Sequence, residues 1–413
     1  MGDETLTQLR QCRELRGWTQ QELADALART AWDLYQQRVG INADMVSKWE
    51  RGIKVPSALY RRVLHRTLPG VSPSSIGGVA QSYGRPDVPT LDHEPISDVA
   101  ARSLWLTSTQ TSSEYLDAVE GLISAVVDSY EKQGPRALIG TVVQRRRDVE
   151  LHLRRPQPIK QVSRLFTLAG QLSGLLAYMS VNLGRFHLAD AYCDEAFALA
   201  QHAEDRELQA WSRGTASLSS YYAGDFAMAL ATARDGLRYA AGGAQAIRLA
   251  INGEARALAR LGNNAGAKRA VDLAYLVASR NDTPAGVTSC ISFGPYGSAR
   301  TAANAATVYV DLSDHEMVEH HARLALPECE ASESVWSQSL VRLDVARSLM
   351  KGKRPEVEQA AALASEALTI SSERPITSVL QRSRDVMAAA TPFAPLPELD
   401  HLAATLALAS TRT

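Results

Sequence analysis

The chain has few cysteines, and they are far apart. The four, Cys12, Cys193, Cys290 and Cys329, form no CxxC pair. Their spacing does not fit the zinc-binding patterns. It predicts thiols that fill small apolar gaps in a reducing cytoplasm, and a redox switch is the alternative.

The sequence also lacks a signal peptide and any run of about 18 apolar residues, so we expect no membrane partner and a cytoplasmic protein. The net charge of the whole chain is −1, which gives no general signal for nucleic acid. Residues 1–70 nevertheless carry eleven Arg or Lys and eight Asp or Glu, a net charge of +3, the sign expected of a DNA-binding end.

No motif for catalysis or cofactor binding is present. The chain has no Gly-rich phosphate loop, no Gly-x-Ser-x-Gly and no metal-spaced Cys/His set. The segment His315–His321 places Glu316 and His320 at i,i+4, but it lacks the second histidine of a zinc-protease motif because position 319 is glutamate. We favour a solvated helix start there, and we expect no enzyme activity, no cofactor and no metal.

Helical periodicity dominates the N-terminal residues. The apolar residues that we expect to face inward in the first helix are Leu6, Leu9, Cys12 and Leu15. The arginines that we expect on its wetter side are Arg10, Arg13 and Arg16. Thr19 and Glu22 have the capping-box spacing of a second helix.

Residues 40–52 predict a short polar helix. Asn42 is a suitable N-cap, and Gly52 suits the position just after the helix. Val46 and Trp49, three apart, are expected to point inward. The outer face then consists of Ala43, Asp44, Ser47 and Lys48. Pro56 and Ser57 open a fourth helix.

These segments resemble the Xre (lambda-repressor-like, Cro/C1-type) helix-turn-helix family over about residues 6–68. The resemblance rests on Trp18–Ala24 (WTQQELA) and Val46–Gly52 (VSKWERG), followed by Pro56. It implies that residues 1–69 form a domain that binds a double-stranded DNA operator. Twelve residues separate Leu27 from Gly40, more than the family usually has, so either the second helix is extended or a loop intervenes.

The resemblance also implies DNA-contacting residues. The candidates for base or phosphate contacts are Gln20, Asn42, Ala43, Asp44, Ser47, Lys48, Arg51, Lys54 and Arg61. For Asp44 the alternative is stabilisation of the helix N-terminus, and for Lys48 it is a solvated charge. Glu50 resembles a family residue that pairs with an arginine of the first helix, here Arg10 or Arg13. The runs Arg145–Arg147 and Arg154–Arg155 are candidates for DNA flank contacts, but we favour a wet face or acidic helix partners.

The remaining chain is expected to be α-helical. Residues 70–98 are rich in Pro, Ser and Gly and predict a linker. Residues 99–164 predict connecting or capping helices. From residue 165 onward, turn residues at positions 184, 224, 262, 313 and 352 separate alanine-rich helices, a spacing typical of stacked helix pairs.

The small residues that follow these turns resemble those of tetratricopeptide repeats, with longer units and few of the large aromatic positions. The resemblance implies an all-α chain: an N-terminal helix-turn-helix domain followed by a tetratricopeptide-like helical-repeat solenoid over residues 165–413. The irregular stretch 281–298 interrupts it, and we place Phe293, Tyr296 and Arg300 beside an effector groove. The alternative is a surface loop that covers one helix pair.

The layout resembles actinobacterial regulators, many of which govern sporulation or secondary metabolism. A related layout occurs in peptide-sensing quorum regulators of Gram-positive bacteria. We expect a sequence-specific transcription regulator that binds its operator as a homodimer. Its repeats would mediate dimerisation and sense a peptide or small-molecule effector. The alternative is a scaffold in which the repeats hold a protein partner, tethered to DNA without a small effector.

Overall fold

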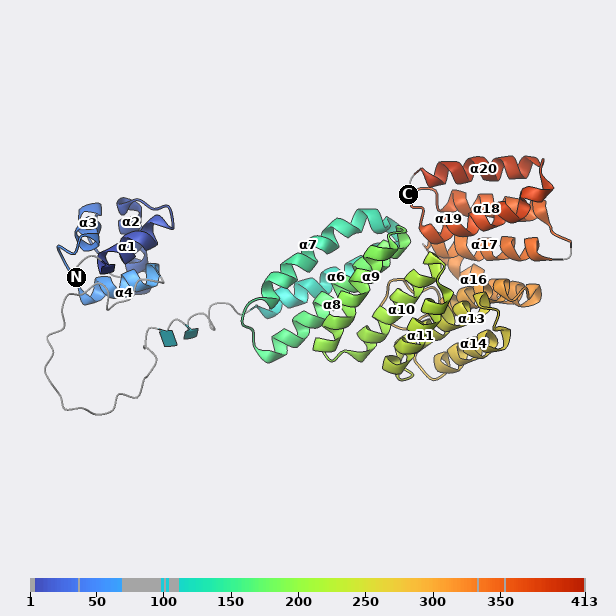
Figure 1. The fold of residues 1–413 in the computed structure, drawn as a ribbon, viewed down its shortest axis with the longest axis horizontal. Coiled ribbons are helices and arrows are strands. Elements are labelled where there is room, and N and C mark those ends of the chain that lie inside the picture. Colours follow the sequence, from blue (N-terminus) through green and yellow to red (C-terminus); the bar gives the residue numbers. More distant parts are fainter. Residues whose placement is uncertain are drawn as a thin grey trace. The chain divides into compact units, whose positions relative to one another are not determined.

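The computed structural model describes residues 4–35, 38–68, 98–99, 102–103, 111–332, 334–352 and 354–411. Within these ranges the regular elements are helices and no strand is present, which confirms the all-α prediction. The chain divides into two compact units, Met1–Ser108 and Thr109–Thr413 (Figure 1). The predicted linker, apart from Asp98, lies outside the described residues.

The first unit is built around one apolar cluster. Its helices are α1 (Glu4–Glu14), α2 (Gln20–Tyr35), α3 (Ala43–Glu50) and α4 (Ala58–Thr67). Helix α2 packs against both α3 and α4. The buried residues of this cluster include Leu9, Leu23, Leu27, Val46, Trp49, Val63 and Leu64.

Local side chains set the ends of these helices. The Thr19 backbone N–H donates to Glu22 Oε2 at 2.6 Å and the Glu22 N–H to Thr19 Oγ1 at 3.2 Å, which confirms the capping box. Asn42 Oδ1 accepts from the Met45 N–H at 3.0 Å. Gly52 has a φ of +68° one residue after the C-cap of α3, a conformation that glycine adopts without strain.

Two expectations for this unit were wrong. Leu15 is 87% exposed, because α1 ends at Glu14 and the chain turns before Leu15 can follow the helical face. Arg13 lies in the interior instead of on the wetter side. The long connection after Leu27 is resolved in favour of an extended helix, since α2 continues to Tyr35.

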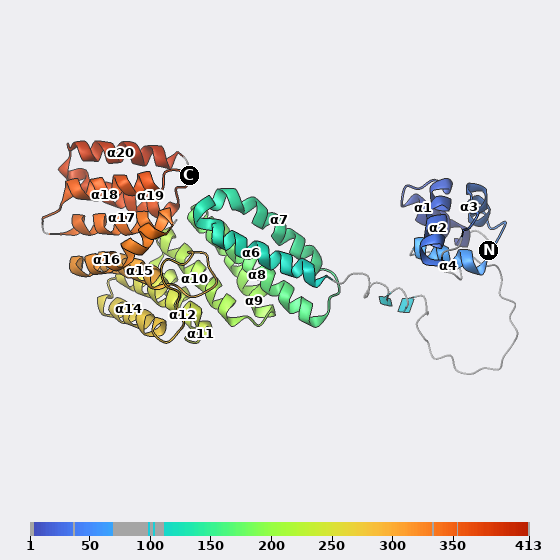
Figure 2. The same cartoon turned by 180° about the vertical axis from the view of Figure 1, so that it is seen from behind.

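The second unit consists of consecutive helices joined mostly by short turns (Figures 1 and 2). It begins with α6 (Ser113–Gln133) and α7 (Pro135–Leu153). Helix pairs follow: α8 (Ile159–Asn182) with α9 (Phe186–His202), α10 (Arg206–Ala223) with α11 (Phe226–Ala240), α15 (Ser298–Asp311) with α16 (His315–Ala331), α17 (Val335–Lys351) with α18 (Val357–Ile370), and α19 (Thr377–Ala390) with α20 (Pro397–Ser410). The 3-10 turn η3 (Thr391–Phe393) joins the last two.

The middle of the array is irregular in two places. A π-helix, η2 (Leu249–Ala255), interrupts one helix between α12 (Ala244–Arg248) and α13 (Arg256–Arg260), and this helix pairs with α14 (Asn264–Ala278). After α14, residues 279–297 form no regular helix before α15 begins. Both irregular segments contribute to the interior of the unit, as described below.

Distant parts of the second unit touch each other. Thr377 Oγ1 at the start of α19 donates to the Asn182 carbonyl at the end of α8, at 3.0 Å. Gln381 Nε2 donates to the Tyr222 carbonyl on α10, also at 3.0 Å. The helix pairs therefore curve until α19 meets α8 and α10.

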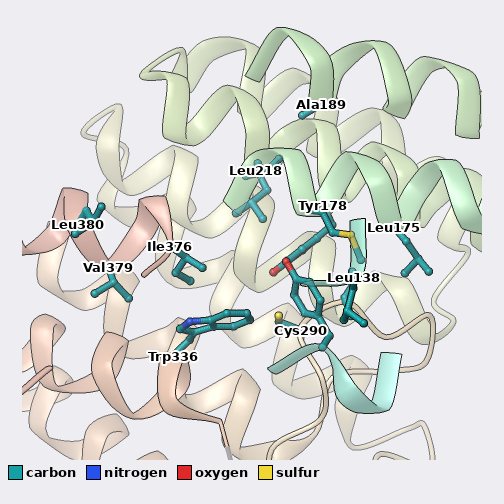
Figure 3. Packing of buried hydrophobic residues seen from close by; sticks show 14 of the residues in the cluster. Leu138, Leu175, Tyr178, Ala189, Leu218, Cys290, Trp336, Ile376, Val379 and Leu380 are labelled. Carbon is teal, nitrogen blue, oxygen red and sulfur yellow. The ribbon is translucent and has the colours of Figure 1, made fainter. Parts of the chain in front are cut away.

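The main apolar cluster of this unit lies where these parts meet. Figure 3 shows Trp336 of α17 near Cys290 of the irregular stretch, with Tyr178 of α8 and Ile376 beside them. Cys193, Cys290 and Cys329 are all buried free thiols, as expected of apolar fillers. In the part of the chain that the structure describes, no helix has the length and apolar character needed to cross a membrane.

Candidate nucleic-acid interface and interior cavity

The position of α3 is fixed by a buried ion pair. Arg13 Nε donates to Glu50 Oε1 at 2.6 Å, and Arg13 Nη2 donates to Glu50 Oε2 at 3.2 Å. Arg13 Nη1 also donates to the Trp18 carbonyl at 2.7 Å. Hydrogen bonding to Glu50 raises the pKa of Arg13 despite its burial. The Arg13 guanidinium therefore joins α1 to α3. Arg13 is thus the first-helix arginine that pairs with Glu50, since Arg10 pairs with Glu14 at 2.8 Å.

One face of α3 is buried and the other faces solvent. Val46 is fully buried, and Trp49 is buried with its ring 5.5 Å from that of Tyr60. The side chains predicted to meet bases lie on the opposite side: Asn42 and Asp44 are exposed, and Ala43 and Ser47 are half-buried. The structure thus brings these four residues together on one accessible surface.

The cationic candidates differ in how freely they can reach a phosphate. Lys48 forms an i,i+4 ion pair with Asp44, so its charge is partly neutralised on the outer face. Arg51 Nε donates to the Ser47 carbonyl at 3.3 Å. Lys54 is exposed in the turn after α3, and Arg61 is half-buried on α4.

Gln20 is held in place within the unit. Its amide nitrogen donates to Glu50 Oε2 at 2.8 Å, and its side chain is half-buried. Gln20 therefore extends the Arg13–Glu50 network to the first turn of α2. A contact from Gln20 to DNA would have to share or replace this hydrogen bond.

The three residues proposed for an effector site have different surroundings. Phe293 packs on Trp211, with ring centroids 4.8 Å apart. Tyr296 is buried, and its hydroxyl accepts from Asn252 Nδ2 at 3.3 Å. Arg300 Nη2 donates to Glu131 Oε1 at 2.7 Å. Tyr296 and Arg300 line an interior cavity, and Phe293 is not among its lining residues.

The irregular stretch passes through the inside of the unit. Ser289 Oγ donates to the Val127 carbonyl at 2.9 Å, and the Cys290 N–H donates to Glu131 Oε1 at 2.8 Å. Trp211 Nε1 donates to the Ser292 carbonyl at 2.8 Å. These bonds attach the stretch to α6 and α10, so it does not merely cover one helix pair.

The cavity has walls from several helices and from the irregular stretch. Its lining residues include Glu131, Tyr178, Tyr222, Asn252, Arg256, Asn304, Trp336 and Arg382. Arg256 is 2% exposed. Arg256 was not among the residues expected at a site. Asn252 and Arg256 are polar residues at i,i+4, but the same helix also carries Gln245, Arg248, Glu254 and Arg260, so no sequence pattern singles them out.

The remaining charged motifs have ordinary partners. Arg146 is buried; it donates to Ser173 Oγ at 2.8 Å and pairs with Glu195 of α9, as expected of an acidic helix partner. His315 Nδ1 lies 2.9 Å from Ser348 Oγ, and His321 lies between Tyr275 and Tyr309. Among the described residues, no group of three or more His, Cys, Asp or Glu is placed to hold a metal ion.

No family model matches the chain, and no curated protein matches it.

Proposed function

We propose that the chain is a sequence-specific DNA-binding transcription regulator, in which the first unit is an Xre-type helix-turn-helix domain. The second unit is a tetratricopeptide-like solenoid that mediates homodimerisation and senses an effector. The observation that carries this proposal is the geometry of α3. It is a short helix, capped by Asn42, with a buried apolar face and an accessible polar face.

The accessible face suits the major groove of DNA. A recognition helix reads base edges with the residues near its N-terminus, while cations nearby hold the phosphates. Asn42 and Asp44 lie at the N-terminal end of the face and Ser47 lies just past its middle, and Arg51 and Lys54 follow after the helix ends. The Arg13–Glu50 pair supports the face from behind, because it fixes α3 against α1.

A homodimer would place two such helices on two half-sites about 34 Å apart, one turn of the DNA. An effector bound in the second unit would change the spacing of the two heads only if it binds the two conformations with different affinity.

The test is recovery of the DNA bound by the full-length protein in its native cells, followed by sequencing. The wild type is compared with a Ser47→Ala, Lys48→Ala double variant. The matched control is Lys160→Ala with Ser163→Ala, which removes the same groups from exposed positions on α8. We expect sharp peaks that share a near-palindrome in the wild type and the control, and their loss in the α3 variant.

Peaks that persist in the α3 variant would rule out the proposed recognition surface. Diffuse binding, together with a defined protein that co-purifies, would favour the scaffold function over the effector-responsive regulator.

A further inference from the structure

We propose that the interior cavity of the second unit binds a small organic anion, a carboxylate on a compact body, with Arg256 as its charge partner. This proposal rests on the proposed function in one respect: that function would make the bound ligand an effector. The cavity is lined by residues of α6, α8, α10, η2, α13, α15, α17 and α19 and of the irregular stretch before α15. A ligand there would contact both early and late helices of the unit.

The first argument is the charge of Arg256. Its guanidinium is bonded to neutral groups: Asn252 Oδ1, and the Tyr222 hydroxyl at 3.3 Å. It also lies 4.1 Å from the ring centroid of Tyr221. Among the described residues, no carboxylate forms an ion pair with it. An arginine keeps its charge even when buried, and a buried charge is costly unless it is paired.

The other charges in the cavity wall are already balanced. Arg300 pairs with Glu131 at 2.7 Å, and Arg382 pairs with Asp344 at 2.5 Å. The wall therefore carries an excess of one positive charge, that of Arg256. Glu131 Oε2 is buried without a hydrogen-bond partner, so it can accept a bond from a hydroxyl or amide group of a ligand.

The charge of Arg256 also acts on the neighbouring Tyr222. Burial raises the pKa of the Tyr222 phenol, but Arg256 and Arg382 outweigh burial and lower that pKa to about 8. The wall thus favours an anion at this position. A ligand carboxylate would satisfy the same cations at neutral pH, where Tyr222 itself is still mostly protonated.

The second, independent argument is the backbone that presents Arg256. The π-helix η2 contains Asn252 and ends directly before Arg256. Such π-helical turns occur frequently at functional sites. Within this π-helix, Asn252 Nδ2 donates to the Tyr296 hydroxyl at 3.3 Å, and Asn252 Oδ1 accepts from Arg256 Nη1. The helix therefore departs from regular geometry at Asn252 and returns to it at Arg256, the two residues that build the polar wall.

The size of the cavity limits the ligand. The volume of the cavity is about 70 Å³, room for on the order of five waters. Asn304 and Leu340 at its edge are partly exposed, and Tyr178, Tyr296 and Trp336 supply aromatic walls. This space suits a compact carboxylate and is too small for a peptide.

The test measures ligand binding to the full chain by calorimetry, without DNA. The probes are formate, acetate and propionate, each beside its uncharged amide of nearly the same shape. For at least one pair, we expect the acid to bind about tenfold or more tightly than its amide, the range for a hydrogen bond to a charged group. Arg256→Gln should abolish this preference, and Arg256→Lys should keep part of it.

The matched control is Arg248→Gln. Arg248 is also 2% exposed and bonded to neutral groups, Thr215 Oγ1 at 2.8 Å and the Trp211 carbonyl at 3.4 Å. It does not line the cavity, so its replacement should leave the acid preference intact. Ala303→Phe, which narrows the cavity edge without removing charge, should weaken the binding of every probe.

The wild-type comparison decides the matter even if Arg256→Gln does not fold. Equal affinity for acid and amide in all three pairs, or no binding of any acid, overturns the proposal. So does an acid preference that survives in a folded Arg256→Gln variant, or one that Ala303→Phe leaves unchanged. If the wild-type protein prefers the acids but recovers no specific DNA sites in its native cells, only the proposed function is contradicted.

Discussion

Arg13 and Glu50 form a two-pronged ion pair inside the first unit, and this pair connects the first helix to the end of α3. The side chains are 10% and 3% exposed. Gln20 donates to the same carboxylate at 2.8 Å. One buried carboxylate thus orients α3 relative to both α1 and α2.

Replacing Glu50 with alanine should destabilise the first unit by about 3 kcal/mol, because the Arg13 guanidinium would be left buried without its partner. Hydrogen exchange measured by mass spectrometry should show loss of protection over residues 4–68, with protection of the second unit unchanged. Asp25→Ala, which removes a carboxylate that is bonded only to the exposed Gln21 among the described residues of the first unit, serves as the control and should have little effect. An equal loss of exchange protection in both variants would contradict a special role for the buried Arg13–Glu50 pair.

Asp44→Asn should distinguish two roles for Asp44. If Asp44 only stabilises the N-terminal end of the helix and pairs with Lys48, its removal frees that cation, so DNA affinity should rise and the slope of log affinity against log salt should steepen by about one. If Asp44 accepts from cytosine N4, specific affinity should fall instead. Titration of operator and random DNA at several salt concentrations separates these results, and Asp128→Asn on α6 controls for net charge.

Gly174→Ala should destabilise the second unit by about 1–3 kcal/mol. A Cβ atom at this position would lie 2.7 Å from Trp211 Cζ3, and the indole is held by its bond to the Ser292 carbonyl. Gly121→Ala on α6 is the matched control: nothing lies within 4 Å of its added Cβ, and alanine should gain up to about 1 kcal/mol of helix propensity. Denaturant unfolding measures the change in free energy of unfolding for both variants. No change for Gly174→Ala would show that the Trp211 ring can move aside.

His321 should make the protein sensitive to acid. Burial, and to a lesser degree the neighbouring His320, lower the pKa of His321 to about 4, whereas an unfolded histidine has a pKa of about 6.5. The folded state thus binds fewer protons between these values. The stability that neutral His321 provides is present above pH 6.5 and is lost as the pH falls toward 4. His321→Gln should flatten the fall in free energy of unfolding over this window. A profile unchanged from that of the wild type, or an equal change in the exposed His401→Gln, would refute this role.

Features that depend only on residues close in the sequence were predictable. The Asn42 cap and the Thr19–Glu22 capping box need only a few residues of context, and both are present. The same reasoning failed at Leu15, because helical spacing alone does not show where a helix stops. It also left Arg10 and Arg13 as equal partners for Glu50, since only packing decides which guanidinium turns inward.

Features that depend on distant residues were not predictable in this way. The stretch around Tyr296 and Arg300 stood out as irregular, but its partner Glu131 lies 169 positions from Arg300. Arg256 escaped notice because an arginine on an alanine-rich helix ordinarily faces solvent. A π-helix directly precedes it, and spacing rules that assume regular helices do not predict such an element.

The contact between α19 and α8 has a consequence for how the second unit unfolds. In an open row of helix pairs each pair touches only its neighbours, so that the ends can melt separately and folding can spread from any point. Here two hydrogen bonds join residues 195 and 159 positions apart. Melting of the first pairs removes partners from the last. The row should therefore melt in one cooperative step, and such distant contacts should also slow its folding.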